Sequence, residues 1–489
     1  MLSHPKMTED SVQKVHAAID EAFPEHLERC RAFLRQKSIS ATGEGVIETA
    51  QMLKSFIEEI GGETTFWGDP SAPIVFGRLD KGAPRTLIIY GMYDVQPADE
   101  PTWISPPFAA EIHTLPGLGE CVIARGATNS KGALCGLFNT LKTIAETDGI
   151  PLNLIFTIEG EEEVGSPQIQ AFIQANKGEL AADGVADFDF SQDVRGKISM
   201  HLGLKGIVYL DLVCRGGKRG GPTETSLHGA DSAWVLSPVW RLIHALSSLT
   251  DNKENIKIPG FYEHMAPPSP QDMQLLKKLA ETFDEKAFLR EMKSICFKYD
   301  RHGVDLLKKG LYSPILNIDG FHAGYSGPGT KTILPRRATA KIDIRFGPSM
   351  EPEEVVEKLR RYLLEQGFDD IEVRVRDSYP WSKTDFSEPV VQRMLRAYHR
   401  HDVEPEVWPM ATWAAPYFVY SRILGLPVAA GGLGHGGRPH VANEYMRVAG
   451  LKDFEKFVAT FLYLMAEEPT PQEGRSPQAG GQDNTAPIG

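Results

Sequence analysis

The segment between residues 86 and 158 constrains the fold most strongly. Its two ends, TLIIY at 86–90 and LNLIFTI at 152–158, are apolar runs typical of buried strands, and residues 133–145 between them are typical of a helix. A strand, a helix and a second strand in this order predict two parallel strands joined by a crossover. We therefore expect an α/β domain with a largely parallel sheet.

Two further helices are expected before this segment. In residues 8–23 an acidic polar turn is followed by apolar residues at helical spacing, and residues 46–60 repeat that spacing. The pair Gly61-Gly62 ends the second helix, because glycine is common just after a helix C-terminus.

The pattern changes near residue 206. Residues 206–214 (GIVYLDLVC) suggest a half-exposed strand, and the apolar residues of 338–344 alternate strictly, as on an antiparallel sheet with one wet face. A helix at 353–366 and a strand at 371–375 follow. These signals predict a small α+β sandwich.

Signals of the first type return after residue 388, so the sandwich is expected to be an insertion. The predicted boundaries are 1–205 and 383–466 for a discontinuous catalytic domain and 206–382 for the inserted domain. Residues 467–489 are rich in Pro, Gly and Gln and have almost no large apolar side chains, so a disordered tail is expected there.

The composition excludes some classes of protein. There are 65 acidic and 52 basic residues, and a net charge of −13 argues against non-specific nucleic-acid binding. No apolar run approaches the length of about 20 residues that a membrane span needs. The first residues lack the apolar stretch of a secretory signal.

The five cysteines are far apart and form no CxxC pair. We expect buried, reduced thiols in a cytoplasmic protein. A catalytic thiol is the alternative, but no local motif supports it.

Stretches that carry acids or histidines stand where the predicted strands of the first domain end. Ligand sites of open α/β sheets lie at the carboxyl ends of the strands. The stretches are GMYDVQP (91–97), ARGATNSKG (124–132), EGEEEVGSP (159–167), SQDVRG (191–196) and, near the end of the domain, GHGGRPHVANE (434–444).

Each stretch alone is a weak signal. An acidic triplet such as Glu161-Glu162-Glu163 is usually a solvated turn, and a lone His440 is more often structural or solvent-facing. Adjacent carboxylates in a cleft repel one another unless a metal ion holds one and another takes a proton. The presence of all five stretches in this order changes the interpretation.

Together they resemble the zinc peptidase family of aminoacylase, succinyl-diaminopimelate desuccinylase, carboxypeptidase G and carnosine dipeptidase. The resemblance covers about residues 25–465 and is closest to the cytosolic dipeptidase branch, since IPGFYEHM (258–265), ILNIDGF (315–321) and GYSGPGTKTILP (324–335) also match. It implies a catalytic α/β domain with an inserted lid domain that often dimerises.

The resemblance also implies roles for individual residues. Family members use two zinc or manganese ions, and a glutamate at the position of Glu162 takes a proton from the attacking water. Glu163 and His440 match ligands of the second metal site, Asp193 matches a ligand of the first, and Asp94 matches the aspartate that orients a ligating histidine. On the lid, His228 matches a histidine that reaches a neighbouring subunit's site. The lid positions that hold the substrate carboxylate or the oxyanion correspond to Arg345, Thr332 and Asn317.

Two metal-ligand positions depart from the family. Its His-x-Asp reads Met92-Tyr93-Asp94, and its bridging aspartate is Asn129. A Met thioether is a soft, neutral ligand that suits copper(I) better than zinc or manganese. Asn has one neutral carbonyl oxygen, whereas a bridging Asp has two anionic ones.

The ligand set therefore keeps only the charges of Glu163 and Asp193. Two divalent ions about 3.5–4 Å apart would repel each other without an anionic bridge. We expect the site of Met92, Asn129 and Asp193 to hold no zinc, and the site of Asn129, Glu163 and His440 to hold at most one ion, zinc or manganese, or none.

Three other positions are affected. Asp94 is left without a histidine to orient, so it is expected to bond elsewhere or to bind substrate. Lys131 is either a supporting or a surface residue, and His435 is either a substitute ligand or a mobile loop residue. A Gly-Ser pair of the family is replaced in Trp413-Ala414-Ala415-Pro416, which suggests a shifted specificity.

Three functions remain open. The first is a hydrolase of peptide or N-acyl amide bonds in which Glu162 activates water. The second is a metal-independent enzyme on the same scaffold, for amide formation, acyl transfer or other acid/base chemistry. The third is a non-catalytic binding relative. Arg345 suggests a small substrate with a free carboxylate, and His228 suggests a homodimer through the lid.

Overall fold

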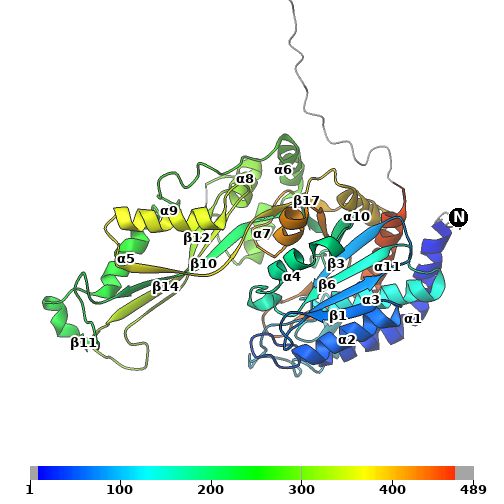
Figure 1. Cartoon of the computed structure of the whole chain (residues 1–489), viewed down its shortest axis with the longest axis horizontal. Coiled ribbons are helices and arrows are strands. Elements are labelled where there is room, and N and C mark those ends of the chain that lie inside the picture. The colour runs from blue at the N-terminus through cyan, green and yellow to red at the C-terminus, as the bar shows by residue number, and fades with distance from the viewer. Residues whose placement is uncertain (1–8, 299, 469–489) are drawn as a thin grey trace, which may run out of the picture. The chain divides into compact units, whose positions relative to one another are not determined.

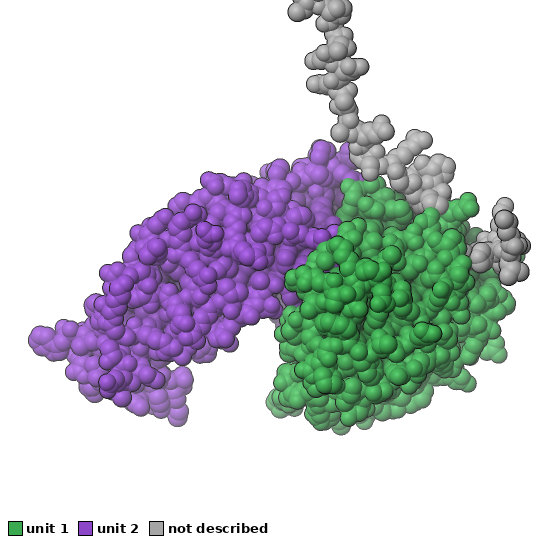
Figure 2. All heavy atoms as spheres, viewed as in Figure 1, with its two compact units in different colours: residues 1–200, 384–406, 423–489 green, residues 201–383, 407–422 purple. Residues whose placement is uncertain are grey.

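The computed structural model of the protein describes residues 9–298 and 300–468 (Figure 1). The chain divides into two compact units (Figure 2). Unit 1 consists of the described residues within 1–200, 384–406 and 423–489, and unit 2 of those within 201–383 and 407–422.

Residues 407–422 group with unit 2, although the predicted boundaries place them in the catalytic domain. The Leu202 N–H donates to Trp408 O at 2.9 Å and the Ala411 N–H donates to Gly203 O at 2.6 Å. Met410 also packs in an apolar cluster with residues of two unit 2 helices. Local periodicity cannot show such long-range packing. The predicted disordered tail, apart from Glu467 and Glu468, lies outside the described residues.

Unit 1 is built on a six-stranded sheet, and the prediction of a largely parallel sheet is confirmed. Strand β3 pairs in parallel with β6 and β7, and β18 pairs in parallel with β7; only β2, which pairs with β1 and β6, runs in the opposite direction. In sheet order the strands are β1 (Glu63–Trp67), β2 (Ile74–Leu79), β6 (Asn153–Glu159), β3 (Thr86–Met92), β7 (Gly184–Phe188) and β18 (Val428–Gly431).

Helices flank this sheet (Figure 1). They are α1 (Glu9–Arg35), α2 (Val46–Glu59), α3 (Lys131–Thr147), α4 (Ile169–Ala175), α10 (Pro389–Arg400) and α11 (Val448–Ala466). The predicted helices at 46–60 and 133–145 are α2 and α3. The helix predicted at 8–23 continues through Pro24 to Arg35, because its second half buries Cys30, Phe33 and Leu34.

A second sheet of unit 1 lies next to the loop that carries His440. Its order is β19 (Gly436–Gly437), β20 (Tyr445–Arg447), β5 (Gly119–Ile123) and β4 (Glu111–Leu115). All neighbouring strands are antiparallel. The sheet therefore ties the segment around His440 to the segment before Asn129.

Unit 2 has an antiparallel four-stranded sheet, as the alternating pattern predicts. Its order is β12 (Ile315–Ala323), β14 (Arg337–Phe346), β10 (Gly206–Arg215) and β15 (Ile371–Tyr379). One face packs against α5 (Pro238–Leu249) and α9 (Pro352–Glu365) around Leu210, Leu212 and Ile342. The opposite face carries charged side chains.

Smaller elements complete unit 2. A short hairpin pairs β11 (Leu227–His228) with β13 (Ile333–Leu334), and β9 (Gly203–Leu204) pairs with β16 (Ser382–Lys383). Three helices, α6 (Pro270–Thr282), α7 (Glu285–Glu291) and α8 (Gly303–Tyr312), lie between β11 and β12 in the chain. In the described parts of both units, no helix is long and apolar enough to cross a membrane.

Candidate active site

The carboxyl ends of three parallel strands bring the predicted stretches together in unit 1. In the β3–β6 register Met92 lies opposite Glu159, and in the β3–β7 register Tyr90 lies opposite Asp187. The residues that follow these strands therefore meet at one edge of the sheet, where ligand sites of such sheets lie. Glu162 and Glu163 begin a short 3-10 turn there (Glu162–Val164).

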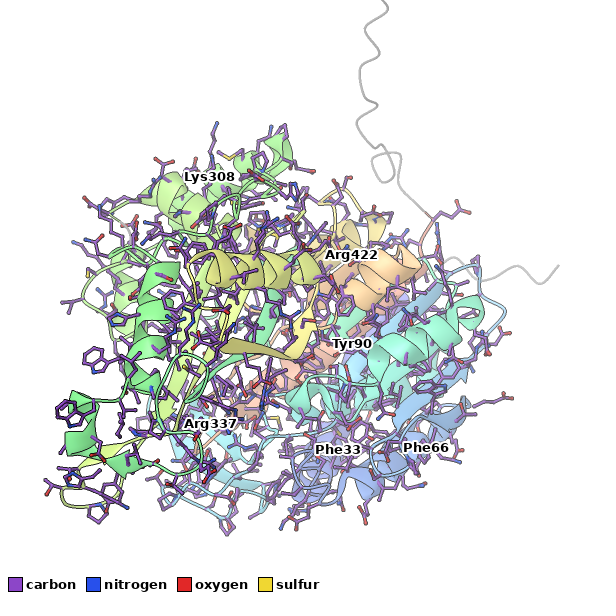
Figure 3. All side chains as sticks on the ribbon, turned by 60° about the vertical axis from the view of Figure 1, so that its left-hand side comes forward. Phe33, Phe66, Tyr90, Lys308, Arg337 and Arg422 are labelled. Carbon is purple, nitrogen blue, oxygen red and sulfur yellow. The ribbon has the colours of Figure 1, made fainter. Side chains whose placement is uncertain are left out.

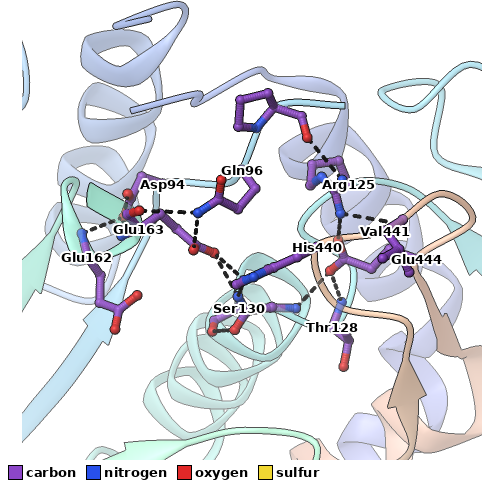
Figure 4. Close-up of polar contacts among 12 residues, drawn as sticks. Asp94, Gln96, Arg125, Thr128, Ser130, Glu162, Glu163, His440, Val441 and Glu444 are labelled. Atoms are coloured by element: carbon purple, nitrogen blue, oxygen red, sulfur yellow. Dashed lines mark hydrogen bonds and ion pairs between the residues drawn. The ribbon is translucent and has the colours of Figure 1, made fainter. Parts of the chain in front are cut away.

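Asp94 holds this turn in place. Its side chain is fully buried, and its two oxygens accept the backbone N–H groups of Glu162 at 3.1 Å and Glu163 at 3.0 Å (Figure 4). Burial raises the pKa of Asp94 to about 6. In this chain Asp94 thus orients the two glutamates, which gives it a structural task without a ligating histidine.

Glu163 lies among three nitrogen atoms (Figure 4). Gln96 Nε2 donates to Oε2 at 2.9 Å, and Asn129 Nδ2 donates to Oε1 at 2.7 Å. His440 Nε2 lies 3.0 Å from the same Oε1 and 2.8 Å from Asn129 Nδ2. The hydrogen bond and the charge of Glu163 raise the pKa of His440. The structure therefore brings Asn129, Glu163 and His440 together, as predicted.

These three side chains form a triangle that hydrogen bonds satisfy only in part. His440 Nε2 can accept a hydrogen bond from Asn129 or donate one to Glu163, but it cannot do both. If the Asn129 amide turns by 180°, its oxygen faces the same point as Glu163 Oε1 and His440 Nε2. Donor atoms around one tetrahedral zinc lie roughly 3.3 Å apart, given bonds of about 2.0–2.1 Å. The triangle therefore fits a single divalent ion.

The other two predicted ligands, Met92 and Asp193, have different surroundings. Met92 ends β3 with a neutral thioether, and Asp193 lies in a turn after β7. The Asp193 carboxylate accepts Arg195 Nε at 2.8 Å, Arg195 Nη2 at 2.7 Å and the Lys197 N–H at 2.9 Å. Among the described residues, no three His, Cys, Asp or Glu side chains are grouped to hold a metal ion.

A second aspartate, Asp189, lies nearer to the end of β7 than Asp193 does. It follows β7 directly, and continuing the register of Tyr90 with Asp187 puts it opposite Met92. The sequence has two aspartates within five positions here, and the stretch 191–196 contains only the second of them. The ligand role of Asp193 stays a prediction.

Glu162 is the acid without a partner. Among the described residues, no donor lies within hydrogen-bonding distance of its carboxylate, and no dashed line reaches it in Figure 4. Burial and the charges of Glu159, Glu163 and Asp94 raise its pKa well above the usual value. A raised pKa makes a carboxylate a stronger base, which favours the acceptance of a proton from water.

Glu159 lies at the end of β6 below Glu162. Its side chain is buried and accepts the hydroxyl of Tyr90 on β3 at 2.8 Å (Tyr90 is labelled in Figure 3). Burial raises the pKa of Glu159 to about 8.

A buried ion pair that the sequence analysis missed supports the site. Glu444, fully buried, accepts the N–H groups of Thr128 at 3.0 Å and Asn129 at 2.9 Å. Its other oxygen accepts Arg125 Nη1 at 2.8 Å, and Arg125 Nη2 donates to Pro97 O at 3.0 Å. Both residues stand inside stretches that we selected, but only distant contacts reveal their role.

Lys131 and His435 are both buried and supporting. Lys131 Nζ donates to Gln36 O at 2.5 Å and lies 4.7 Å from the centre of the Phe33 ring. His435 Nδ1 contacts Gln192 O at 2.7 Å, and its Nε2 contacts the Tyr445 hydroxyl at 2.9 Å. Both nitrogens of His435 are occupied, so it is neither a substitute ligand nor a mobile loop residue.

The predicted lid residues lie at two places in unit 2. On the hairpin of β11 and β13, Thr332 Oγ1 lies 2.9 Å from His228 Nε2. On the sheet, Arg345 Nε donates to Asp343 Oδ1 at 3.0 Å, and Asn317 Nδ2 donates to Asp343 Oδ2 at 3.1 Å.

Of the cysteines, Cys296 is exposed and the other four are buried, so the expectation of five buried thiols is wrong for Cys296.

Comparison with known proteins identifies the family. The model of peptidase family M20/M25/M40 matches residues 88–467, so the chain belongs to this family, and the resemblance stated above is confirmed. A metallo-carboxypeptidase of the M20 family from Sulfolobus solfataricus has a solved structure with a TM-score of 0.83 and 30% identity; the match covers 90% of this chain and 99% of that one.

Two dipeptidases are also similar in sequence. The Cys-Gly metallodipeptidase of Schizosaccharomyces pombe is 27% identical over 72% of this chain and 75% of its own length. The Beta-Ala-His dipeptidase of Mus musculus is 28% identical over 60% of this chain. The match spans only 58% of the mouse enzyme.

The buried pair of Arg125 and Glu444 yields a stability prediction. Arg125→Leu leaves the Glu444 carboxylate buried without its cation, so we expect a loss of about 3–5 kcal/mol in the free energy of unfolding. Urea titration followed by circular dichroism measures this loss. Arg78→Leu, which removes an exposed pair with Glu179, is the control and should cost about 0–1 kcal/mol.

The double variant Arg125→Leu with Glu444→Leu should be more stable than Arg125→Leu alone, since no buried charge remains unpaired. Equal stability of Arg125→Leu and Arg78→Leu would show that the pair does not support the loops.

Proposed function

We propose that the protein hydrolyses the amide bond of a small peptide or N-acyl amino acid with a free carboxylate. The observation that carries the proposal is the unpaired carboxylate of Glu162, which Asp94 fixes at the edge of the sheet. The sequence similarity to dipeptidases supports the same reaction class. In this reaction Glu162 takes a proton from water and delivers it to the nitrogen of the leaving amine.

We propose that the centre holds at most one divalent ion, zinc or manganese. Its ligands would be Glu163, His440 and the turned amide of Asn129, a set with one negative charge. A bound ion lowers the pKa of water and polarises the amide carbonyl. The thioether of Met92 and the neutral Asn129 leave no anionic bridge for a second ion beside Asp189.

A second candidate is acid/base chemistry without a metal on the same scaffold. It is favoured by the N–H groups of Gln96 and Asn129, which already satisfy two lone pairs of Glu163. Transfer of an acyl group to an amine would need the same proton carrier, Glu162. Full activity in the presence of a strong chelator would favour this candidate over the one-ion centre.

We also propose a homodimer through unit 2. Trp240 and Ile243 lie one helical turn apart on α5 and are 62% and 36% exposed. Trp234 and Leu236, just before α5, are 89% and 69% exposed. Exposed apolar residues that gather in one segment mark an interface. A second copy of this chain is the occupant we propose, since the same unit carries His228.

The role of Glu162 can be tested by Glu162→Gln. The amide cannot accept a proton, so turnover of a panel of dipeptides and N-acetyl amino acids should fall about 10²–10⁴-fold. Amine release measures the rate, and circular dichroism confirms the fold. Glu161→Gln is the control, since the Glu161 carboxylate is bound to Gln168. Unchanged turnover in Glu162→Gln would exclude Glu162 as the base.

The missing ligands can be restored. Met92→His combined with Asn129→Asp adds an imidazole and an anionic bridge, so we expect the metal content to rise from at most about one to about two ions per chain. Elemental analysis after equilibration with zinc and gel filtration measures it. Met92→Leu is the control and should not change the content. If the double variant binds no more zinc than the parent, these positions are not ligand positions.

The proposed interface predicts a concentration-dependent dimer. Trp240→Glu with Leu236→Glu places two charges on the apolar segment, so sedimentation velocity should show a monomer where the parent is a dimer. Leu364→Glu on α9, at a position 62% exposed, is the control and should remain dimeric. A parent protein that sediments as a monomer would exclude the proposed homodimer.

A further inference from the structure

Arg345 is held in one orientation by groups of unit 2. Its Nε donates to Asp343 Oδ1 at 3.0 Å and its Nη1 donates to Thr412 O at 3.2 Å. Among the described residues, Nη2 has no acceptor. The guanidinium is planar, so fixing Nε and Nη1 also fixes the direction of the free Nη2 edge.

Asp343 is well placed to keep this orientation. It is 4% exposed, and its second oxygen accepts Asn317 Nδ2 at 3.1 Å. A buried carboxylate that accepts from both neighbours cannot leave the sheet without losing two hydrogen bonds. It therefore constrains the side chains of Arg345 and Asn317 together.

A second carboxylate, Asp319, lies beside this pair. Asn317 Nδ2 also donates to Asp319 Oδ1 at 2.8 Å, so one amide group bridges two acids. Asp319 is exposed on the open face of the sheet. Partial desolvation and the adjacent carboxylate of Asp343 raise the pKa of Asp319 to about 6.

We propose that Asp343 is a positioning residue for Arg345 and that Asp319 makes the recognition of a substrate carboxylate depend on pH. This inference rests on the proposed selection of substrates with a free carboxylate. When Asp319 is ionised, its charge opposes a second anion near Arg345. When it is protonated, one negative charge fewer faces the substrate, and the carboxylate binds more tightly.

Other charged and titratable groups surround Asp319 on the same face. They are Tyr209 and Asp211 on β10, Lys341, Asp343 and Arg345 on β14, and Arg376 and Asp377 on β15. Asp211 is paired with Arg376. Removal of Asp319 alone therefore isolates its contribution from these neighbours.

The test compares the dipeptide alanylalanine with its C-terminal amide. The ratio of their kcat/KM values cancels titrations that affect both substrates, including that of Glu162. For the parent protein we expect a preference of about 10-fold or more for the acid, and the preference should be larger at pH 5.5 than at pH 7.5. In Asp319→Asn the ratio should be the same at both pH values. Glu372→Gln, at an exposed position of β15, is the control and should keep the parent's pH dependence.

Asp343→Ala should lose most of the preference through a higher KM for the acid, with kcat for the amide unchanged. Asp343→Asn keeps an acceptor for Arg345 Nε and should restore part of it. Hydrogen exchange of the Arg345 Nε–H, observed by nitrogen-15 NMR and assigned with Arg345→Lys, should be slow in the parent and fast in Asp343→Ala.

The outcomes are distinct. A pH-independent ratio in the parent would overturn the role of Asp319, and slow exchange or an intact preference in Asp343→Ala would overturn the role of Asp343. If the parent hydrolyses neither substrate, the proposed function fails for this substrate class and the role of Asp319 fails with it. The exchange measurement still decides whether Asp343 positions Arg345.

Discussion

The buried ion pair of Arg125 and Glu444 is the interaction on which the site depends. Two opposite charges without solvent are tolerated only when each also makes further hydrogen bonds. One oxygen of Glu444 accepts hydrogen bonds from the backbone N–H groups of Thr128 and Asn129. Arg125 donates a hydrogen bond to the carbonyl of Pro97. Three loops that come from distant parts of the chain are thereby held at one sheet edge.

The centre that this framework surrounds has an amide, Asn129, beside Glu163. In a two-metal centre, a carboxylate at position 129 would repel Glu163 unless cations lay between them. Here the amide of Asn129 donates a hydrogen bond to Glu163 at 2.7 Å, so the side chain at position 129 attracts the Glu163 carboxylate. Asp94 likewise accepts the backbone N–H groups of Glu162 and Glu163. The retained acids thus have protein partners, and Glu162 alone is left unpaired within the described residues.

Much of the fold follows from the sequence because local patterns report local structure. The apolar runs at 86–90 and 152–158 became β3 and β6, and the alternation at 338–344 became β14. The first helix continued beyond the predicted end because tertiary burial of Phe33 outweighed the proline at 24. Packing of this kind leaves no mark in periodicity.

Site residues could be predicted where a local sequence motif identifies them. They could not be predicted where only a contact between distant segments gives them their role. The structure brings together Asn129, Glu163 and His440, as expected. Asp193 is hydrogen-bonded within its own turn, and Asp189 directly follows strand β7. Arg125 lay inside a selected stretch, but its sequence neighbours do not reveal a partner 319 positions away.

The central claim is that one divalent ion at most is bound, between Glu163 and His440. Anomalous diffraction from crystals equilibrated with zinc, recorded on both sides of the zinc absorption edge, tests it most directly. The account predicts at most one peak per chain, within bonding distance of Glu163 Oε1 and His440 Nε2. Two peaks per chain, with one beside Met92 and Asp189, would contradict it.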